Sequence, residues 1–387
     1  MQRGEIGRYE SVSAGGERVR AFVPLPLPPE PALVLDGPLQ QALEAATLAL
    51  GRLDAVSMLL PDDTIFLYAY VRKEAVLSSQ IEGTQSSLSD LLRFEVEDAP
   101  GAPVEDVVEV SNYVAALDHG LRRLGEGLPI SNRLIREIHA VLLSRGRGSG
   151  KAPGEFRRSQ NWIGGTRPGN ADFVPPPHTV VPDCMAELER FCHADNGLPS
   201  LVRAALAHVQ FETVHPFLDG NGRVGRLLVT LLLCDADVLR QPLLYLSLYF
   251  KQHRSRYYDL LNRVRLTGDW EEWLAFFLEG VRVTAEGAVA TSRRLVETFA
   301  ADRAVTERDA GRRAGSALRV LEALKMRPVL SLAEVCNRSG LSFPAAASAM
   351  QVLAGQGIVR ELTGRPRNRL FCYDRYLSIL AEGTETP

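Results

Sequence analysis

The sequence has little cysteine and almost no excess charge, and both facts narrow the possible classes of protein. Five cysteines stand at positions 184, 192, 234, 336 and 372, form no CxxC pair and are odd in number. This pattern favours a reducing compartment and gives no sign of a zinc site. The formal net charge is −3 over 387 residues, so no global field points to nucleic acid or to a membrane surface.

Long apolar runs and targeting segments are also missing. The longest apolar run, around Leu227 to Cys234, is far shorter than the roughly 20 residues of a membrane-spanning helix. The N-terminus carries no apolar targeting stretch. We therefore expect a cytoplasmic protein without a membrane partner, long enough for two or three domains.

What the sequence does contain is most informative between residues 201 and 233. Apolar residues recur there at helical spacing on both sides of a short polar loop, at Val202, Leu206 and Val209 and then at Val224, Leu227, Leu228, Leu231 and Leu232. The spacing predicts two core helices that flank the loop.

The loop, residues 215–226, reads His-Pro-Phe-Leu-Asp-Gly-Asn-Gly-Arg-Val-Gly-Arg. The backbone amides of Gly220, Asn221 and Gly222 can turn inward as an anion-binding nest, which the positive end of the following helix continues. Arg223 and Arg226, three residues apart, can fork onto phosphate oxygens. The loop therefore suits a polyphosphate.

Two further side chains of the loop suit the same chemistry. Asp219 offers a hard oxygen ligand for a magnesium ion shared with phosphate, and His215 can be a neutral base near pH 7. Taken singly, each feature has a plainer interpretation as a turn, a helix cap or a solvated face. An EF-hand is not favoured, because Arg223 and Val224 stand where calcium needs an oxygen ligand and a glycine.

As a unit, the string matches the HxFxDGNGRxxR signature, and the chain resembles Fic-domain proteins. The resemblance implies a mainly α fold, with a Fic helical core and a small β-hairpin flap. It also implies transfer of AMP from ATP to a Ser, Thr or Tyr hydroxyl of a target protein, with Mg²⁺ and in a homodimer. In that reaction His215 would be the base, Asp219 would hold the metal, and the residues from Gly220 to Arg226, Gly225 among them, would bind ATP.

A second motif lies upstream. Ser78-x-x-x-Glu82-Gly83 matches the inhibitory (S/T)xxxE(G/N) motif of the same family. A Glu82 carboxylate forked onto Arg226 would occupy the group that must hold the γ-phosphate of ATP, and its charge would repel that phosphate. Without the resemblance, Glu82 and Gly83 would be only an exposed acid and a glycine at a helix end.

Residues 153–177 mix β-formers with turn residues and give the only strand signal that we expect before the C-terminal region. In the family such a segment is the flap, which aligns the target protein as an added strand, here near residues 161–175. A surface hairpin that packs Trp162 into the core is an equally good interpretation. Residues 22–30 are too rich in proline for a helix and predict an extended arm.

A helix that starts near Leu246 carries several aromatic residues. The resemblance implies an adenine pocket beside it, with Gln252, His253 and Tyr257 as nucleotide contacts. The charged run 292–313 predicts an exposed helix and connector.

From residue 316 the pattern is helix, helix-turn-helix and hairpin, which is the order of a winged helix. The second helix of that pair, residues 342–354, has no Lys or Arg, whereas four arginines stand around the turn, at 360, 365, 367 and 369. DNA and protein partners are therefore equally favoured.

We expect four parts: an N-terminal arm and helical region with the inhibitory motif (1–98), a Fic catalytic core (99–291), a helical connector (292–315) and a winged-helix domain (316–387). The preferred function is a self-inhibited protein adenylyltransferase. Two alternatives stay open, an enzyme that removes AMP with the help of Glu82 and a nucleotide-sensing, DNA-binding regulator.

Overall fold

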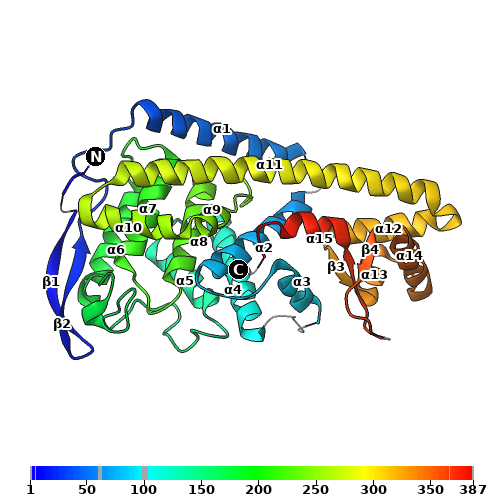
Figure 1. Cartoon of the computed structure of the whole chain (residues 1–387), viewed down its shortest axis with the longest axis horizontal. Helices are drawn as coiled ribbons and strands as arrows, with labels where there is room; N and C mark the ends of the chain where they lie inside the picture. The colour runs from blue at the N-terminus through cyan, green and yellow to red at the C-terminus, as the bar shows by residue number, and fades with distance from the viewer. Residues whose placement is uncertain (1, 5, 60–62, 98–102, 366, 386–387) are drawn as a thin grey trace.

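The structure is a computed structural model that describes residues 2–4, 6–59, 63–97, 103–365 and 367–385. It is mainly helical, as predicted, and one long helix, α11, runs beside α1 along the long axis of the molecule (Figure 1). The helices before the C-terminal region are α1 (Gly37–Leu59), α2 (Asp63–Ile81), α3 (Leu88–Glu97), α4 (Val104–Gly125), α5 (Asn132–Leu142), α6 (Val181–His193), α7 (Ser200–Val214), α8 (Asn221–Asp235), α9 (Ser247–Gln252), α10 (Arg254–Thr267) and α11 (Trp270–Asp309).

The helix pair α7 and α8 forms the centre of the core. Nearly every residue of both helices is buried, because apolar side chains continue around most of their circumference. Helices α2, α4 and α5 pack against α8, while α6, α10 and α11 pack against α7. The two core helices predicted around the polar loop are confirmed, and the loop is held between them.

The predicted helix around residues 131–143 is confirmed together with its cap. The Ser131 side chain accepts a hydrogen bond from the backbone N–H of Leu134 at 3.3 Å, which is the N-cap geometry. Of the linker that the sequence suggests at 99–103, residues 99–102 lie outside the described residues.

The expectation of a single strand signal before the C-terminal region is wrong. Strands β1 (Gly7–Ala14) and β2 (Glu17–Pro24) form an antiparallel hairpin at the N-terminus. Ala14 pairs with Glu17, so the connection is the two-residue turn Gly15-Gly16, whose positive φ angles of 54° and 81° match the twist of a hairpin. The arm continues irregularly beyond Pro24 and lies on α7, where the Gln210 side chain donates to the Leu25 carbonyl at 2.9 Å.

The hairpin expected within 153–177 is reduced to one antiparallel bridge, between Ile163 and Phe173. Three consecutive prolines, at 175–177, remove backbone donors and prevent a longer ladder. The N-terminal hairpin supports this segment from outside, because the Phe22 N–H donates to the Val174 carbonyl at 2.9 Å.

Helix α11 continues without a break through residues 291 and 292, where we expected the core to meet a connector. The charged run is helical, but it is not wholly exposed. Leu295, Phe299, Asp302 and Thr306 are buried along one face, because the C-terminal elements pack against it. The division of the chain into four parts stays a prediction.

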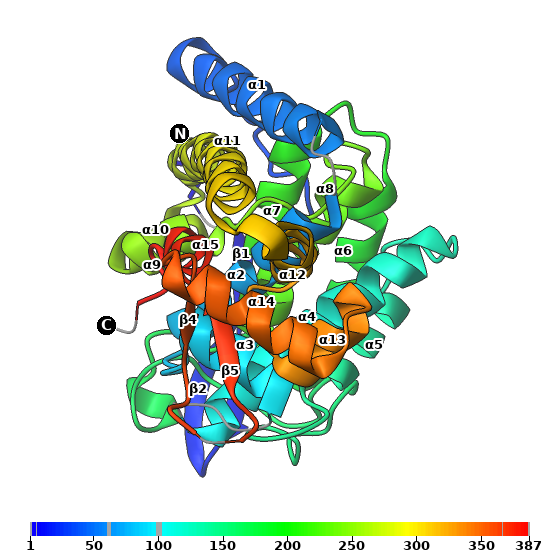
Figure 2. The same ribbon diagram turned by 90° about the vertical axis from the view of Figure 1, so that its right-hand side faces the viewer.

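The C-terminal region contains the expected order of elements (Figure 2). A three-stranded sheet has the order β3-β5-β4, and an unpredicted helix, α15, follows it. The elements are α12 (Ala314–Met326), β3 (Val329–Ser331), α13 (Leu332–Ser339), α14 (Phe343–Gly355), β4 (Val359–Glu361), β5 (Leu370–Tyr373) and α15 (Asp374–Ala381). The winged-helix assignment and its DNA or protein partner stay predictions.

The last described residues return to the core. The Gln80 side chain donates to the carbonyls of Thr384 and Ser86, both at 2.9 Å. No helix in the described ranges is long and apolar enough to cross a bilayer.

Candidate active site

The polar loop between α7 and α8 lies at the floor of a cavity of about 290 Å³. His215 ends α7 in the left-handed conformation, with φ 48° and ψ 60°, which turns the chain sharply into the loop. Ten residues line the cavity: Glu82, Glu109, Arg147, His215, Leu218, Asp219, Gly220, Asn221, Gly222 and Arg223. Eight of them, the seven between His215 and Arg223 together with Glu82, are predicted site residues or belong to the predicted loop.

The shape of the loop is set by Asn221, whose side chain spans it. Its carboxamide oxygen accepts from the Phe217 N–H and its amide group donates to the Phe217 carbonyl, both at 2.8 Å. The side chain of Asn221 is therefore a brace, and its backbone N–H lies at the start of α8, where orphan donors face the cavity.

His139 is a support that the sequence analysis missed. Its ring stacks on Phe217 with centroids 3.7 Å apart, and its Nδ1 accepts from the Gly154 N–H at 2.8 Å. Its Nε2 therefore carries the proton and donates to the Asp219 carbonyl at 3.0 Å. Burial lowers the pKa of His139 to about 4, so the ring is neutral and serves structure.

His215 is held as a neutral imidazole. Burial, together with the positive charges of Arg265 and Arg157, lowers its pKa to about 3. Arg157 fixes the backbone here, because its Nε donates to the His215 carbonyl at 3.0 Å. The Nδ1 atom of His215 is buried on the side of Glu212 and makes no hydrogen bond within the described part of the chain, while the residue as a whole lines the cavity.

Glu212 lies one turn before His215, with its Oε2 4.0 Å from His215 Nδ1. Burial raises the pKa of Glu212 to about 7, although the charge of Arg226 opposes the shift. The buried Arg265 guanidinium donates to the Glu212 carbonyl at 3.1 Å and to Thr213 Oγ1 at 3.2 Å. The buried side chains of Glu212 and Arg265 thus lie behind the histidine.

Arg226 is buried and fully engaged by the helix that carries the predicted inhibitory motif. Its Nη2 lies 2.7 Å from Glu82 Oε1 and 3.0 Å from the Ser78 carbonyl, and its Nε donates to Ser78 Oγ at 2.8 Å. The ion pair anticipated from the sequence is thus present. Burial acts to raise the pKa of the Glu82 carboxyl, but the charge and hydrogen bond of Arg226 outweigh it and hold that pKa below its usual value.

Two glycines allow this approach. A Cβ at Gly222 would lie 2.2 Å from Glu82 Oε1 and 3.0 Å from Arg226 Nη1, so a side chain there would expel the carboxylate. Gly83, which follows Glu82, has φ 97°, a conformation that lets the chain turn away directly after the carboxylate.

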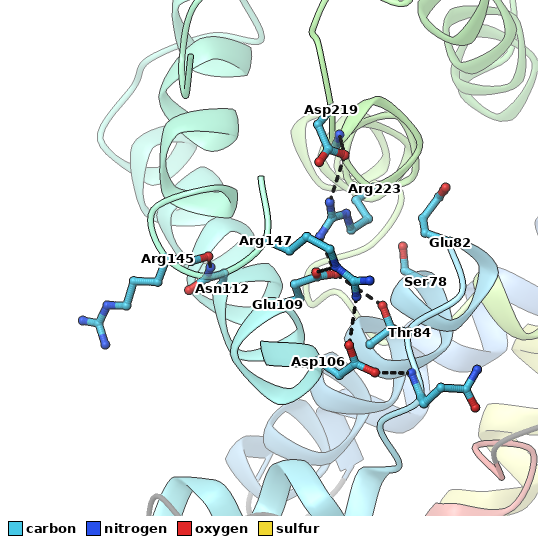
Figure 3. Close-up of polar contacts among 12 residues, drawn as sticks. Ser78, Glu82, Thr84, Asp106, Glu109, Asn112, Arg145, Arg147, Asp219 and Arg223 are labelled. Atoms are coloured by element: carbon cyan, nitrogen blue, oxygen red, sulfur yellow. Dashed lines mark hydrogen bonds and ion pairs between the residues drawn. The ribbon is translucent and has the colours of Figure 1, made fainter. Parts of the chain in front are cut away.

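Arg223, one turn before Arg226, is held by a different carboxylate. Its Nη1 lies 3.2 Å from Glu109 Oε2 on α4, and its Nη2 lies 3.5 Å from Asp219 Oδ1. The Nε of Arg223 is buried and has no partner among the described residues. Figure 3 shows Glu109 between Arg223 and Arg147.

Asp219 fits a magnesium ion that is shared with phosphate. Its side chain lines the cavity and is 38% exposed, and its Oδ1 accepts from the Gly220 N–H at 2.6 Å. No group of three or more His, Cys, Asp or Glu suited to a metal occurs in the ranges that the structure covers. One carboxylate beside a phosphate cavity suits magnesium, which keeps water and phosphate as its other ligands, and does not suit a cage built by protein alone.

A second cavity, of about 560 Å³, adjoins the same centre. It shares Glu82, His215 and Gly222 with the first cavity, and its walls include flap residues 162–164 and 172–173. The predicted contact Tyr257 lines it, and the Tyr257 hydroxyl bonds with His208 Nε2 at 2.8 Å. Gln252 and His253 are exposed and line neither cavity, because the helix breaks at His253 between α9 and α10.

The structure therefore brings together most of the predicted residues and adds others. Gly225 is buried behind the loop, where a Cβ would lie 2.5 Å from Glu212 Oε1, so it supports the site without lining it. The residues that the sequence analysis missed are Glu109, His139, Arg147, Glu212, Arg254, Tyr258 and Arg265. Glu212 had a usable signal, since it stands three residues before His215 on one helix face.

Comparison with known families agrees with this geometry. Residues 129–233 match the Fic/DOC family, and residues 40–122 match the Fic/DOC family N-terminal region. The chain therefore contains a Fic domain preceded by a Fic N-terminal region.

Curated relatives are named protein adenylyltransferase Fic. One from Culex quinquefasciatus is 32% identical over 179 residues, which is 44% of this chain and 33% of that protein. One from Drosophila grimshawi is 30% identical over 188 residues, which is 48% of this chain and 36% of that protein. The matched part of this chain spans only about a third of the length of these relatives.

Solved structures share the fold. A Fic family protein from Desulfovibrio desulfuricans G20 aligns over 88% of this chain and 97% of its own, with a TM-score of 0.56 and 18% identity. A Fic domain containing signaling protein from Bacteroides thetaiotaomicron covers 64% of this chain and 95% of its own, with a TM-score of 0.52 and 19% identity.

Proposed function

We propose that this protein is a self-inhibited protein adenylyltransferase, which moves AMP from ATP to a Ser, Thr or Tyr hydroxyl of a target protein. One observation carries the proposal. The neutral His215, the carboxylate of Asp219 and the buried Arg223 line one cavity together with the backbone of Gly220 to Gly222. Arg226 lies one helical turn after Arg223 on α8. The names of the curated relatives support the same reaction.

His215 is the proposed general base. The imidazole takes the proton of the target hydroxyl, whose oxygen forms a bond to the α-phosphorus while the bond to the bridging oxygen of pyrophosphate breaks. The depressed pKa keeps the imidazole free to accept that proton at neutral pH. Pyrophosphate leaves with the electron pair of the broken bond, and AMP stays on the target oxygen.

The charge of the triphosphate is met by the loop and by the start of α8. Amides at Gly220, Asn221 and Gly222 face the developing charge, and Arg223 and Arg226 bind the distal phosphates. Asp219 would hold Mg²⁺, which supplies charge neutralisation at the phosphates when it is bound. Positioning and electrostatics supply most of the rate gain in such transfers.

Glu82 would inhibit by keeping Arg226 occupied. The carboxylate lies 2.7 Å from the guanidinium and also lines both cavities, so its charge faces the space that the phosphates need. A distal phosphate must displace Glu82 before it can bind Arg226. The side chain of Glu82 is 37% exposed, which gives it room to leave.

The target would dock at the flap. Residues 162–164 and 172–173 line the cavity that contains His215, and the single bridge between Ile163 and Phe173 leaves most backbone groups of this segment without a strand partner. An extended segment of a target protein can add there as a strand, with its hydroxyl directed toward His215.

The test uses ATP labelled at the α-phosphate, magnesium and three purified proteins: wild type, Glu82→Gly, and Glu82→Gly with His215→Ala. We expect Glu82→Gly to acquire protein-bound label, wild type to acquire little, and the double variant to acquire none. Circular dichroism and thermal unfolding of all three proteins establish that the folds are equal.

Absence of label from every folded variant would contradict AMP transfer. Loss of label from a previously AMP-modified protein only when Glu82 is intact would then favour the removal of AMP. Nucleotide binding without either reaction would favour a nucleotide-dependent regulator.

A further inference from the structure

The loop between α5 and the flap, residues 143–154, crosses the mouth of the phosphate cavity and carries an arginine with no assigned role. Gly146 and Gly148 stand on either side of Arg147 and have φ angles of 77° and 90°, so the backbone turns sharply at both neighbours. This turn places the Arg147 side chain over the cavity that Gly220, Asn221 and Gly222 line. The neighbouring Arg145 points away from the cavity (Figure 3).

The partners of Arg147 are two acids of α4. Its Nε lies 2.7 Å from Glu109 Oε1, and its Nη2 lies 2.8 Å from Asp106 Oδ1. The Arg147 side chain is 57% exposed, whereas those of Glu109 and Asp106 are 6% and 12% exposed. The arginine is therefore the mobile member of the cluster and the carboxylates are its fixed members.

If Arg147 leaves, Glu109 keeps a cationic partner, while Asp106 keeps one hydrogen bond and loses its cation. If it departs, Glu109 keeps Arg223 at 3.2 Å and Thr84 Oγ1 at 3.3 Å. Asp106 keeps the Gln85 N–H at 2.7 Å. Uncompensated buried carboxylates are costly, so the exchange costs chiefly the ion pair of Asp106, while Glu109 stays compensated by Arg223.

Two further observations connect the Arg147 loop with Arg223 and Asp219. The Nε of Arg223, a side chain only 5% exposed, is a buried donor without a partner among the described residues. The loop of Arg147 also touches the proposed metal ligand, since a Cβ at Gly148 would lie 2.8 Å from Asp219 Oδ2. Phosphate oxygens bound near Asp219 would lie within the same cavity as Arg147.

We propose that Arg147 is a third phosphate-binding residue, which exchanges Glu109 and Asp106 for a phosphate of the bound nucleotide. This rests on the proposed function for the identity of the nucleotide, but it requires only that a polyphosphate occupies the cavity. Arg147 itself is 57% exposed, so solvent screens its pairs with Glu109 and Asp106, whereas a guanidinium forked onto phosphate makes strong charge-assisted bonds. The exchange therefore favours the phosphate and closes the loop 143–154 over it.

The test measures binding rather than transfer, by calorimetry on the full chain carrying Glu82→Gly. The probes are ATP, inorganic tripolyphosphate and AMP. We expect Arg147→Ala to weaken tripolyphosphate and ATP binding about tenfold, which corresponds to about 1.4 kcal/mol, and to leave AMP binding within about twofold. Arg147→Lys should recover part of the loss, because it keeps the charge and loses the fork.

Arg145→Ala is the matched control, since Arg145 is an exposed arginine of the same loop whose side chain points elsewhere. It should leave the affinity for all three probes unchanged. A second variant, Asp106→Asn, keeps an acceptor for Gln85 but weakens the resting partner of Arg147, so it should tighten tripolyphosphate binding a few-fold.

Equal tripolyphosphate affinity in Arg147→Ala and its parent would overturn the proposal. An equal loss of affinity for AMP and for tripolyphosphate would also overturn it, as would weaker tripolyphosphate binding in Asp106→Asn. Either result would mean that Arg147 only stabilises the conformation of loop 143–154. A selective loss of tripolyphosphate affinity in protein that transfers no AMP would support Arg147 and contradict the proposed reaction, so the two failures are distinguishable.

Discussion

The two arginines of the loop motif stand one helical turn apart, and each is held by a carboxylate of a very different kind. Arg226 is bound by Glu82, at the end region of α2, whose side chain is 37% exposed and is followed directly by a turn at Gly83. Arg223 is bound by Glu109, in the first half of α4, whose side chain is 6% exposed and has two further partners. A carboxylate at a chain turn can leave its arginine, whereas a carboxylate within a packed helix cannot.

The difference separates inhibition from positioning. Glu82 competes with phosphate for Arg226, while Glu109 orients Arg223 so that its unpaired Nε stays buried at the cavity wall. Neutralising the carboxylate of one ion pair should therefore raise the labelling activity, and neutralising the carboxylate of the other should lower it.

The largest effect is expected for Glu82→Gln, which keeps the shape of the side chain and removes its charge. The Gln carboxamide oxygen can still accept from Arg226, so only the additional strength of the charged acceptor, about 1–1.5 kcal/mol, is lost, and label incorporation should rise by about tenfold. Initial rates with ATP labelled at the α-phosphate measure the change. Label at the wild-type level in Glu82→Gln, together with strong label in Glu82→Gly, would show that the size of the Glu82 side chain, and not its charge, causes the inhibition.

The opposite direction is expected for Glu109→Gln, introduced into the Glu82→Gln protein. Arg223 would lose its charged partner, so we expect the KM for ATP to rise about tenfold and kcat to change less. The melting temperature should also fall, because the buried Arg223 would keep only the more distant Asp219 carboxylate, 3.5 Å away, as a counter-ion. Glu105→Gln, on an exposed position of the same helix, is the control and should change none of these values.

A smaller contrast is expected between the hydroxyl groups that support each pair. Ser78 Oγ accepts from Arg226 Nε at 2.8 Å, whereas Thr84 Oγ1 lies 3.3 Å from Glu109 Oε2. In the Glu82→Gln protein, Ser78→Ala should raise the KM for ATP about threefold, because it removes one hydrogen bond of ordinary strength. Thr84→Val should raise it less than about twofold, because its hydrogen bond is longer. Equal effects would remove the distinction between the two supports.

The smallest effect concerns pH. Because the pKa of Glu82 is lowered, its carboxylate stays charged down to pH values below its ordinary pKa, and the ion pair weakens only as pH falls through the lowered value. The ratio of the labelling rates of Glu82→Gln and wild type should therefore stay constant within about twofold from pH 5 to pH 8. Glu212, whose pKa is about 7, changes charge in that range, and the charge of Glu82 helps to raise this pKa, so the ratio is measured with Glu212→Gln present in both proteins. A ratio that collapses between pH 7 and pH 5 would contradict a low pKa for Glu82.

The core of the site was predictable because it is local in sequence. His215, Asp219 and the two arginines lie within twelve residues, so their spacing alone placed them around one loop. The contact between Glu82 and Arg226 spans 144 residues and was anticipated only through the resemblance to a known motif. Its inhibitory role stays a proposal.

Residues that act from distant elements could not be found in this way. Glu109 reaches Arg223 across 114 residues, and neither position carries a local pattern that indicates the pair. Arg147 lies in a glycine-rich loop that the sequence shows only to be irregular. Such contacts depend on how α4, α5 and α8 pack, and one sequence does not determine that packing.

Other differences have local causes. Gly15-Gly16 between two alternating segments is a hairpin signal that the sequence analysis did not use. Gln252 and His253 were expected beside the nucleotide because the resemblance implies an adenine pocket beside the helix that starts near Leu246. The break at His253 turns both side chains to solvent.

The unbroken course of α11 has a mechanical consequence. Forty residues of helix make a beam about 60 Å long, attached to α7 near one end by the Trp273 indole, which donates to the Ala205 carbonyl at 3.0 Å. Toward the other end Asp302 accepts from the Tyr373 hydroxyl at 2.8 Å, beside the three-stranded sheet. Because α11 is one continuous helix, a force applied to that sheet is transmitted along it, by bending and twisting, to α7, the helix that ends at His215.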